Sequence, residues 1–488
     1  MKKLNYKIVI LLSVMIFSMS AIFWASGAVA TTTSSPKSSA GVDITIIVTD
    51  QQLPGVENVT DDFLNSIYGG GVNSVTVESS GSDASVQLTT LSTAMAAGST
   101  DYDVVGIDVV WTGFFADNGW IIPLDSYLTT GEMDNFVGGM VDACTYNGHV
   151  YAYPYFMNLG ILFYRKDLMD LNGFTPADFE TWEGLNATAN YILNNMSGTL
   201  DNPNLVGYVG QFDNYEGGVC NFFEIAGSNG ATDLVSGNTV NIYPNSKLVD
   251  AMTFFQGLIP PQYTGVQGTP LAPNPYIIPR TGLVMDEGSS VTTWQENNSI
   301  FMRQWTFGYG NSLDNNVDFG IAPLPHFEGA TDAKTSVVGG AILTIPNSID
   351  SAHRAAAINL TKYLGMPFAQ RRELMNTTNF PALKSIYSAP PAGFEWISNW
   401  TDQLDQTLSR PVEAQYPLIS SAISNDFSNI LSGGKTVTQA LSDMQTNVNE
   451  ILAGTPSVPA IPGYDIGMIL FASASALGII IMIRKRRK

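Results

Sequence analysis

A run of β-branched residues that ends in an acid and an aromatic constrains this chain more than any other segment. Residues 104–110 read VVGIDVV, with almost no alternation of apolar and polar side chains. This pattern is typical of a strand covered on both faces in a parallel sheet. Asp108 and Trp111 lie at its carboxyl end, where ligands of open α/β sheets bind, so they predict one side of a binding crevice. The alternative is that Asp108 caps a turn and Trp111 belongs to the core.

Strand-like and helix-like segments alternate around this run. Strand patterns at residues 42–48 and 72–77 flank a helical face at Phe63, and a second helical pattern, Leu88 to Met95, stops at Gly98. This β-α-β-α-β order predicts right-handed crossovers and a parallel sheet. The patterns also predict strands near residues 150–164, 206–209, 319–322 and 341–345, and helices at residues 353–364 and after Thr436.

Both ends of the chain carry patterns of an exported, anchored protein. Residues 1–30 combine lysines, an apolar run and an Ala-x-Ala pattern, which predict a signal peptide. Residues 31–41 predict a flexible leader, and residues 454–463 a Pro-rich stalk. Residues 464–483 predict a transmembrane helix, and the basic residues 484–488 a cytoplasmic tail. We therefore expect a single-pass protein at the cell surface, with an extracellular ectodomain between these segments.

Charge excludes one class of partner. The chain has 43 acidic and 22 basic residues, and eight of the basic residues lie in the two terminal segments. The ectodomain is therefore strongly acidic, which argues against a nucleic-acid partner.

Two kinds of residue bear on covalent modification outside the cell. Cys144 and Cys220 could pair in an oxidising compartment, although a chain of this length can build its core without a disulfide. Seven Asn-x-Ser/Thr tripeptides predict possible glycan sites. They begin at Asn58, Asn186, Asn195, Asn297, Asn359, Asn376 and Asn399.

The residue inventory gives no catalytic or metal-binding motif. The three histidines, His149, His326 and His353, are too scattered for a metal-ligand spacing, and no nucleophile elbow, Walker loop or dinucleotide fingerprint occurs. We therefore expect no catalytic residue, no metal and no cofactor. Paired carboxylates of a glycosidase stay an alternative, because two carboxylates need only meet in space.

Aromatic residues recur beside carboxylates, amides and an arginine near expected strand and turn ends. These groups are Tyr155 with Asn158, Tyr215 with Glu216, Trp305 with Tyr309, and Arg410 with Tyr416. Aromatic rings stack on the apolar face of a sugar, whereas the polar side chains satisfy its hydroxyls. The pattern favours a carbohydrate site, although most aromatic residues of such a chain lie in its core.

Several segments in a fixed order resemble the extracellular solute-binding proteins of carbohydrate ABC importers, which include the maltose- and trehalose/maltose-binding proteins. The first is DVVGIDVVWTGFFADNGWIIPLDSYL, and the others lie at residues 146–169, 210–230, 321–329, 336–348 and 410–441. The resemblance implies an α/β, two-lobed periplasmic-binding-protein-like fold of type II. Three hinge crossovers are expected near residues 155–158, 319–322 and 364–368. Lobe 1 would comprise residues 42–156 and 322–364, and lobe 2 residues 157–321 and 365–453.

The resemblance also implies a set of sugar-binding residues between the lobes. Asp108 and Glu216 would accept from hydroxyls, Arg410 would donate, and Trp305 would be a stacking platform. The full set is Asp108, Trp111, Tyr155, Asn158, Tyr215, Glu216, Trp305, Gly340 and Arg410. The chain departs from the family in two places: residues 339–341 read Gly-Gly-Ala where many relatives have Gly-Gly-Trp, and Asn158 replaces a frequent Asp.

These expectations describe a membrane-anchored receptor that captures a carbohydrate and delivers it to the permease subunits of an ABC transporter. One rival is a surface glycoside-active enzyme, and another is a surface-layer or adhesion protein. A third keeps the fold but binds a peptide, a polyamine or a metal chelate, since the acidic ectodomain suits a cation.

Overall fold

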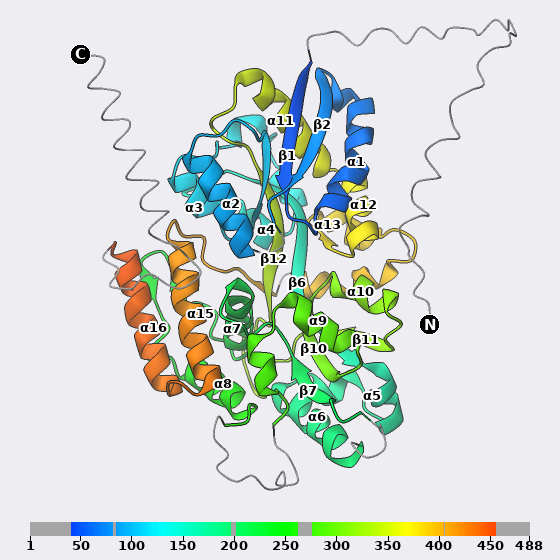
Figure 1. The fold of residues 1–488 in the computed structure, drawn as a ribbon, viewed down its shortest axis with the longest axis vertical. Helices are drawn as coiled ribbons and strands as arrows, with labels where there is room; N and C mark the ends of the chain where they lie inside the picture. The colour runs from blue at the N-terminus through cyan, green and yellow to red at the C-terminus, as the bar shows by residue number, and fades with distance from the viewer. Residues whose placement is uncertain (1–40, 82–83, 197–201, 262–275, 405, 455–488) are drawn as a thin grey trace, which may run out of the picture. The chain divides into compact units, whose positions relative to one another are not determined.

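A computed structural model of the chain describes residues 41–81, 84–196, 202–261, 276–404 and 406–454 (Figure 1). The predicted signal peptide and leader up to residue 40, the stalk from residue 455, the transmembrane helix and the basic tail lie outside these ranges. None of the helices in the described ranges combines the length and apolarity that a bilayer crossing requires.

The amino-terminal elements form the predicted parallel sheet. Strand β1 (Val42–Val48) pairs in parallel with β2 (Val72–Ser79) and with β3 (Val104–Asp108). Helices α1 (Leu53–Asn65) and α2 (Ala84–Ala96) connect these strands. The β-α-β-α-β prediction is therefore confirmed.

Two long strands continue this sheet. The order is β2-β1-β3-β12-β6-β10-β7, in which β12 (Ser336–Thr344) runs antiparallel to both β3 and β6 (Tyr153–Arg165). Strand β6 pairs with β12 up to Leu159 and then with β10 (Ser299–Trp305) from Gly160 onward. Its second half also pairs with β11 (Phe319–Ala322), and β10 pairs with β7 (Val206–Val209). Figure 1 shows β6 and β12 running between an upper group of elements, which includes β1, β2 and α1, and a lower group, which includes β7 and β10.

Helices cover the sheet, and short elements join them. Further α-helices are α3 (Thr112–Asp117), α4 (Gly138–Ala143), α5 (Lys166–Asn172), α6 (Trp182–Met196), α7 (Glu216–Ser228), α8 (Ser246–Gly257), α9 (Glu287–Gln295), α10 (Gly308–Asp314), α11 (Ser351–Leu364), α12 (Pro367–Thr377), α13 (Lys384–Ser388), α14 (Thr401–Leu404), α15 (Tyr416–Ser432) and α16 (Val437–Leu452). Short strands are β4 (Thr145–Tyr146), β5 (His149–Val150), β8 (Val235–Ser236), β9 (Thr239–Val240), β13 (Phe380–Pro381) and β14 (Thr407–Leu408). Short 3-10 helices span Ile67–Gly69, Asp125–Tyr127, Met133–Asn135, Pro176–Phe179, Arg280–Val284 and Glu395–Trp400.

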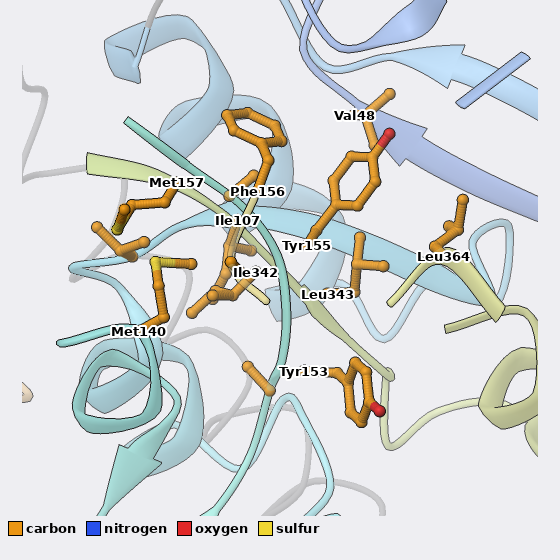
Figure 2. Packing of buried hydrophobic residues seen from close by; sticks show 14 of the residues in the cluster. Val48, Ile107, Met140, Tyr153, Tyr155, Phe156, Met157, Ile342, Leu343 and Leu364 are labelled. Atoms are coloured by element: carbon orange, nitrogen blue, oxygen red, sulfur yellow. The ribbon is translucent and has the colours of Figure 1, made fainter. Parts of the chain in front are cut away.

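Buried apolar side chains form two core clusters. In the first, Ile107 of β3, Tyr155 of β6 and Ile342 of β12 pack together (Figure 2). The second is built largely from helices α6, α7, α8, α15 and α16. Neighbouring strand residues contribute to different clusters: Phe301 belongs to the second and Met302 to the first, because successive side chains of a strand face opposite sides of the sheet.

The segment from α12 to α14 packs in the first core cluster. Its residues Leu374, Phe380 and Trp400, which the sequence prediction places in lobe 2, are buried in this cluster. Helix α12 packs on α1, where Arg372 donates to the carbonyl of Asn58 at 2.6 Å. Leu404 is the last residue of this segment in the first cluster, and Leu408 belongs to the second.

The cysteines lie in separate cores. Cys144 belongs to the first cluster and Cys220 to the second, and both are buried free thiols.

Candidate functional site

Strand β12 brings together three side chains from distant parts of the chain. The carbonyl of Val338 accepts a hydrogen bond from Arg410 Nη2 at 3.1 Å. The next residue, Gly339, lies against the indole of Trp305. Two positions further on, the strand pairs with Asp108, the last residue of β3. At about 3.3 Å per residue, these contacts fall within roughly 10 Å along β12.

Arg410 and Glu216 form a buried ion pair in this group. Arg410 Nη1 donates to Glu216 Oε1, and the two side chains are 1% and 8% exposed. Glu216 also accepts from the hydroxyl groups of Tyr416, at 2.6 Å, and Ser420. It is the first residue of α7, where the helix dipole favours a negative charge. Glu216 is therefore held by three protein donors and serves chiefly as the counter-ion of Arg410.

Asp108 is bound more loosely. Its Oδ1 lies 3.6 Å from Arg410 Nη2, and it accepts from the backbone N–H of Val110 at 3.2 Å. The side chain is 22% exposed. Burial raises the pKa of Asp108 to about 6, against the lowering effect of Arg410 and with a further raising effect of Glu216. Asp108 therefore keeps acceptor capacity and some access to solvent.

Arg410 also carries a buried donor. Among the described residues, its Nε has no hydrogen-bond partner. An unsatisfied buried donor costs about 1–3 kcal/mol, so a group that accepts from it would be bound favourably. Arg410 lines a cavity of about 10 Å³, which is no larger than one water molecule requires. A larger molecule could enter this cavity only if the surrounding elements moved apart.

Trp305 contacts two charged side chains in another part of this polar group. Its Nε1 donates to Glu287 Oε1 at 3.2 Å, and Glu287 Oε2 accepts from the hydroxyl of Tyr215 at 2.5 Å. The guanidinium carbon of Arg303 lies 3.9 Å from the centroid of the Trp305 ring. Only 8% of Trp305 is exposed. The predicted residues Tyr215 and Trp305 therefore meet through a shared carboxylate.

Asn158 and Gly340 lie on β6 and β12 beside these residues. Asn158 pairs with Gly339 across the strands, and its Oδ1 accepts from the hydroxyl of Thr306 at 2.6 Å. Gly340 has a φ of +121°, and a Cβ there would lie 2.4 Å from the carbonyl oxygen of Phe156. A backbone requirement therefore explains this glycine without reference to a ligand.

The structure does not bring the Tyr155 and Trp111 side chains into this polar group. Tyr155 is 1% exposed and donates to Glu373 Oε2 at 2.8 Å, on α12. Trp111 is 3% exposed and stacks on Phe115, with ring centroids 6.4 Å apart. Both rings are part of the first core, in line with the alternative reading of Trp111.

Three residues of the group were not predicted. They are Glu287, Thr306 and Ser420. A sequence signal exists for one of them: Asp286 and Ser289 form a capping box at the start of α9, which marks Glu287 as a first-turn acid. No local pattern distinguishes Thr306 or Ser420 from other hydroxyl residues.

The described ranges contain no group of three His, Cys, Asp or Glu side chains that could hold a metal ion.

The sheet order and the likeness to the solved structures below define a two-lobed α/β fold of the periplasmic-binding-protein kind. The chain belongs to the bacterial extracellular solute-binding protein family, whose model matches residues 68–401. This confirms the resemblance found in the sequence, and it identifies the chain as a solute-binding receptor for an ABC transporter. The family and the neighbours below are substrate-binding proteins and not enzymes. Its members are extracellular, which suggests a surface or periplasmic location.

Individual proteins agree with this assignment. A probable ABC transporter-binding protein of Deinococcus radiodurans is 27% identical over 368 residues, which cover 73% of this chain and 81% of the relative. The solved structure of maltose-bound MalE3 of T. maritima is 25% identical with a TM-score of 0.71, covering 83% of this chain and 98% of that one. The Thermus thermophilus maltotriose-binding protein, 17% identical with a TM-score of 0.66 and coverages of 84% and 99%, shares the fold.

Proposed function

We propose that this protein is a membrane-anchored extracellular carbohydrate receptor that delivers a sugar or oligosaccharide to the permease of an ABC transporter. The observation that carries the proposal is that Asp108, which has spare acceptor capacity, lies 3.6 Å from Nη2 of Arg410, whose buried Nε has no partner among the described residues. Such a pair suits the hydroxyl groups of a sugar, which both donate and accept. The likeness to maltose-bound MalE3 supports the same class of solute.

The proposed mechanism uses groups from two sides. Asp108, at the end of β3, accepts from a hydroxyl, and Arg410 donates while Glu216 balances its charge. Trp305 offers an apolar surface to the C–H face of the ring. The small cavity volume beside Arg410 requires the elements to separate for entry and to close again on the solute. Closure is favoured because both sides contact the same molecule, whereas a molecule indifferent to the two states would shift nothing.

Membrane anchoring rests on the sequence alone. The apolar residues 464–483 and the basic residues 484–488 support a carboxyl-terminal anchor, and residues 1–30 support export. An anchored receptor stays near its permease, which suits delivery from outside the cell.

A thermal-shift screen of the full chain in detergent tests the proposed solute. Maltose, maltotriose and a set of other mono- and oligosaccharides are compared with small peptides. A sugar present at 100 times its Kd should stabilise the protein by about 2.7 kcal/mol, since it binds only the folded state. Asp108→Asn is the matched control, because it removes one acceptor with little change in volume. Stabilisation by a peptide and by no sugar would overturn the carbohydrate assignment.

A polyamine is the second candidate. The carboxylates of Glu216 and Glu287 both raise the pKa of Asp108, so three acids lie in a region where Arg410, itself paired with Glu216, is the cation that acts on Asp108. Spermidine therefore belongs in the same screen. A shift with spermidine that salt abolishes, together with none from sugars, would favour this candidate.

A further inference from the structure

A buried ion pair lies directly behind Trp305. Arg303 donates from Nε to Glu224 Oε2 at 2.8 Å and from Nη2 to Oε1 at 2.6 Å. Its third nitrogen, Nη1, donates to Gln211 Oε1 at 2.9 Å. The Arg303 and Glu224 side chains are 0% and 2% exposed. Because bidentate pairing holds the planar guanidinium in one orientation, both its position and its plane are fixed.

The fold makes room for this pair. Gly160 of β6 lies beside it, and a Cβ there would come within 2.0 Å of Glu224 Oε1. Glu224 Oε1 also accepts from the backbone N–H of Val337 in β12, at 3.3 Å. The pair thus links α7, β10 and β12, the three elements that carry Glu216, Trp305 and the carbonyl of Val338.

The guanidinium is also a contact of the Trp305 ring. Arg303 and Trp305 are two residues apart in β10, so their side chains leave the same face of the strand. The guanidinium carbon lies 3.9 Å from the ring centroid, within the range of a cation–π contact. Because Glu224 balances the charge of Arg303, the contact can hold the ring without adding a net positive charge behind it.

Trp305 is therefore restrained at three points. Arg303 covers part of the ring surface, Glu287 accepts from Nε1, and Gly339 meets the six-membered ring. A Cβ at Gly339 would lie 2.8 Å from Cζ3 of Trp305. Neither Arg303 nor Glu224 is among the residues proposed to contact the solute.

We propose that Arg303, locked by Glu224, is a positioning residue that fixes the plane of Trp305 and leaves the solute only the part of the ring that the guanidinium does not cover. Its relevance to binding rests on the proposed contact between Trp305 and the solute, whereas the positioning itself can be measured without any solute.

The test is NMR of the full chain labelled with ¹⁵N-tryptophan. The indole signal of Trp305 is identified by its loss in Trp305→Phe. In the double variant Arg303→Met with Glu224→Gln, both charges disappear while an amide oxygen is kept for Val337. We expect the Trp305 Nε1–H signal to move and its exchange with solvent to become at least tenfold faster. The indole of Trp294, which donates to Ser312 at 3.0 Å, should not change.

Two further variants sharpen the result. Lys435→Met with Asp426→Asn removes another ion pair that does not touch Trp305, and should leave its signal unchanged. Arg303→Lys keeps the charge but loses the fork of donors, so its exchange rate should fall between those of the wild type and the double variant. It also serves as the test if the double variant does not fold. An unchanged Trp305 signal in either folded variant would overturn the positioning role.

Measurements of carbohydrate affinity distinguish this positioning role from the proposed function. If a carbohydrate binds, its affinity should fall at least tenfold in the double variant and fall no further when Trp305→Ala is added, since both changes act through one ring. Additive losses would overturn action through Trp305. If no carbohydrate binds the wild type while the indole signal behaves as expected, the proposed function fails and the positioning role stands.

Discussion

Asp108 lies 3.6 Å from Arg410, which is close enough for an ion pair but too far for a hydrogen bond. The hydrogen bonds of Arg410 go instead to Glu216 and to the carbonyl of Val338. Asp108 is consequently a largely buried carboxylate, and Arg410 and the Val110 N–H offset only part of the cost of burying its charge. Its pKa therefore rises from 3.8 to about 6.

The first prediction concerns stability against pH. Because the pKa of Asp108 is higher in the folded than in the unfolded protein, the folded state binds more protons between about pH 4 and pH 6. Stability from this group is therefore lost as pH rises through that window, by up to about 3 kcal/mol. Asp108→Asn should flatten this dependence and be more stable than the wild type at pH 7, as urea unfolding at several pH values would measure. An equal change in the exposed Asp402→Asn variant would contradict the assignment.

The second prediction concerns the buried pair. Arg410→Met leaves Glu216 buried without its cation, which should lower the free energy of unfolding by about 3–5 kcal/mol. Adding Glu216→Gln should restore part of that loss. Arg372→Met is the control, because its ion pair with Asp62 is about half exposed and such pairs contribute about 0–1 kcal/mol. Equal losses for both arginines in urea unfolding would refute the special role of Arg410.

The third prediction concerns the apolar surface of the proposed site. Trp305→Ala should weaken binding of the sugar found in the screen more than tenfold, because the ring that stacks on it is lost, while the fold survives. Calorimetric titration gives the Kd, and circular dichroism checks the fold. Tyr191→Ala removes an aromatic ring that is 50% exposed and should leave the Kd unchanged. An unaltered Kd for Trp305→Ala would mean that the solute binds elsewhere.

The fourth prediction separates two glycines. Gly340→Ala adds a Cβ at a φ of +121°, 2.4 Å from a carbonyl oxygen, and should destabilise the protein by at least about 2 kcal/mol. Gly138, at the start of α4, has nothing within 4 Å of an added Cβ. Gly138→Ala should therefore be neutral or mildly stabilising. Thermal unfolding compares the two, and similar melting temperatures would contradict the role given to Gly340.

Strands with a simple apolar pattern could be predicted from sequence, and β1, β7 and β11 were found with the same bounds as in the structure. Strand β10 was missed. Its buried Arg303 and Gln304 interrupt the apolar pattern, and the partner that permits this burial, Glu224, lies 79 residues away.

Prediction of the site was limited in the same way, by contacts between residues that are far apart in the sequence. Sequence reasoning selected Asp108, Trp305 and Arg410, which converge on β12, because an acid, an aromatic or an arginine near a strand or turn end is locally visible. It also selected Tyr155, whose hydroxyl is bound by a glutamate 218 residues away. Local sequence cannot distinguish a ring at a strand end that faces a ligand from one that faces the core.

The position of β12 has a consequence for how the receptor is made. Thr344 at its end donates to the carbonyl of Val105, 239 residues earlier, so its partner strand β3 emerges from the ribosome long before it. Pairing across so long a segment is slow compared with local helix formation. The polar group along β12 therefore cannot assemble until β12 and Arg410, which lie in the last third of the chain, have been synthesised.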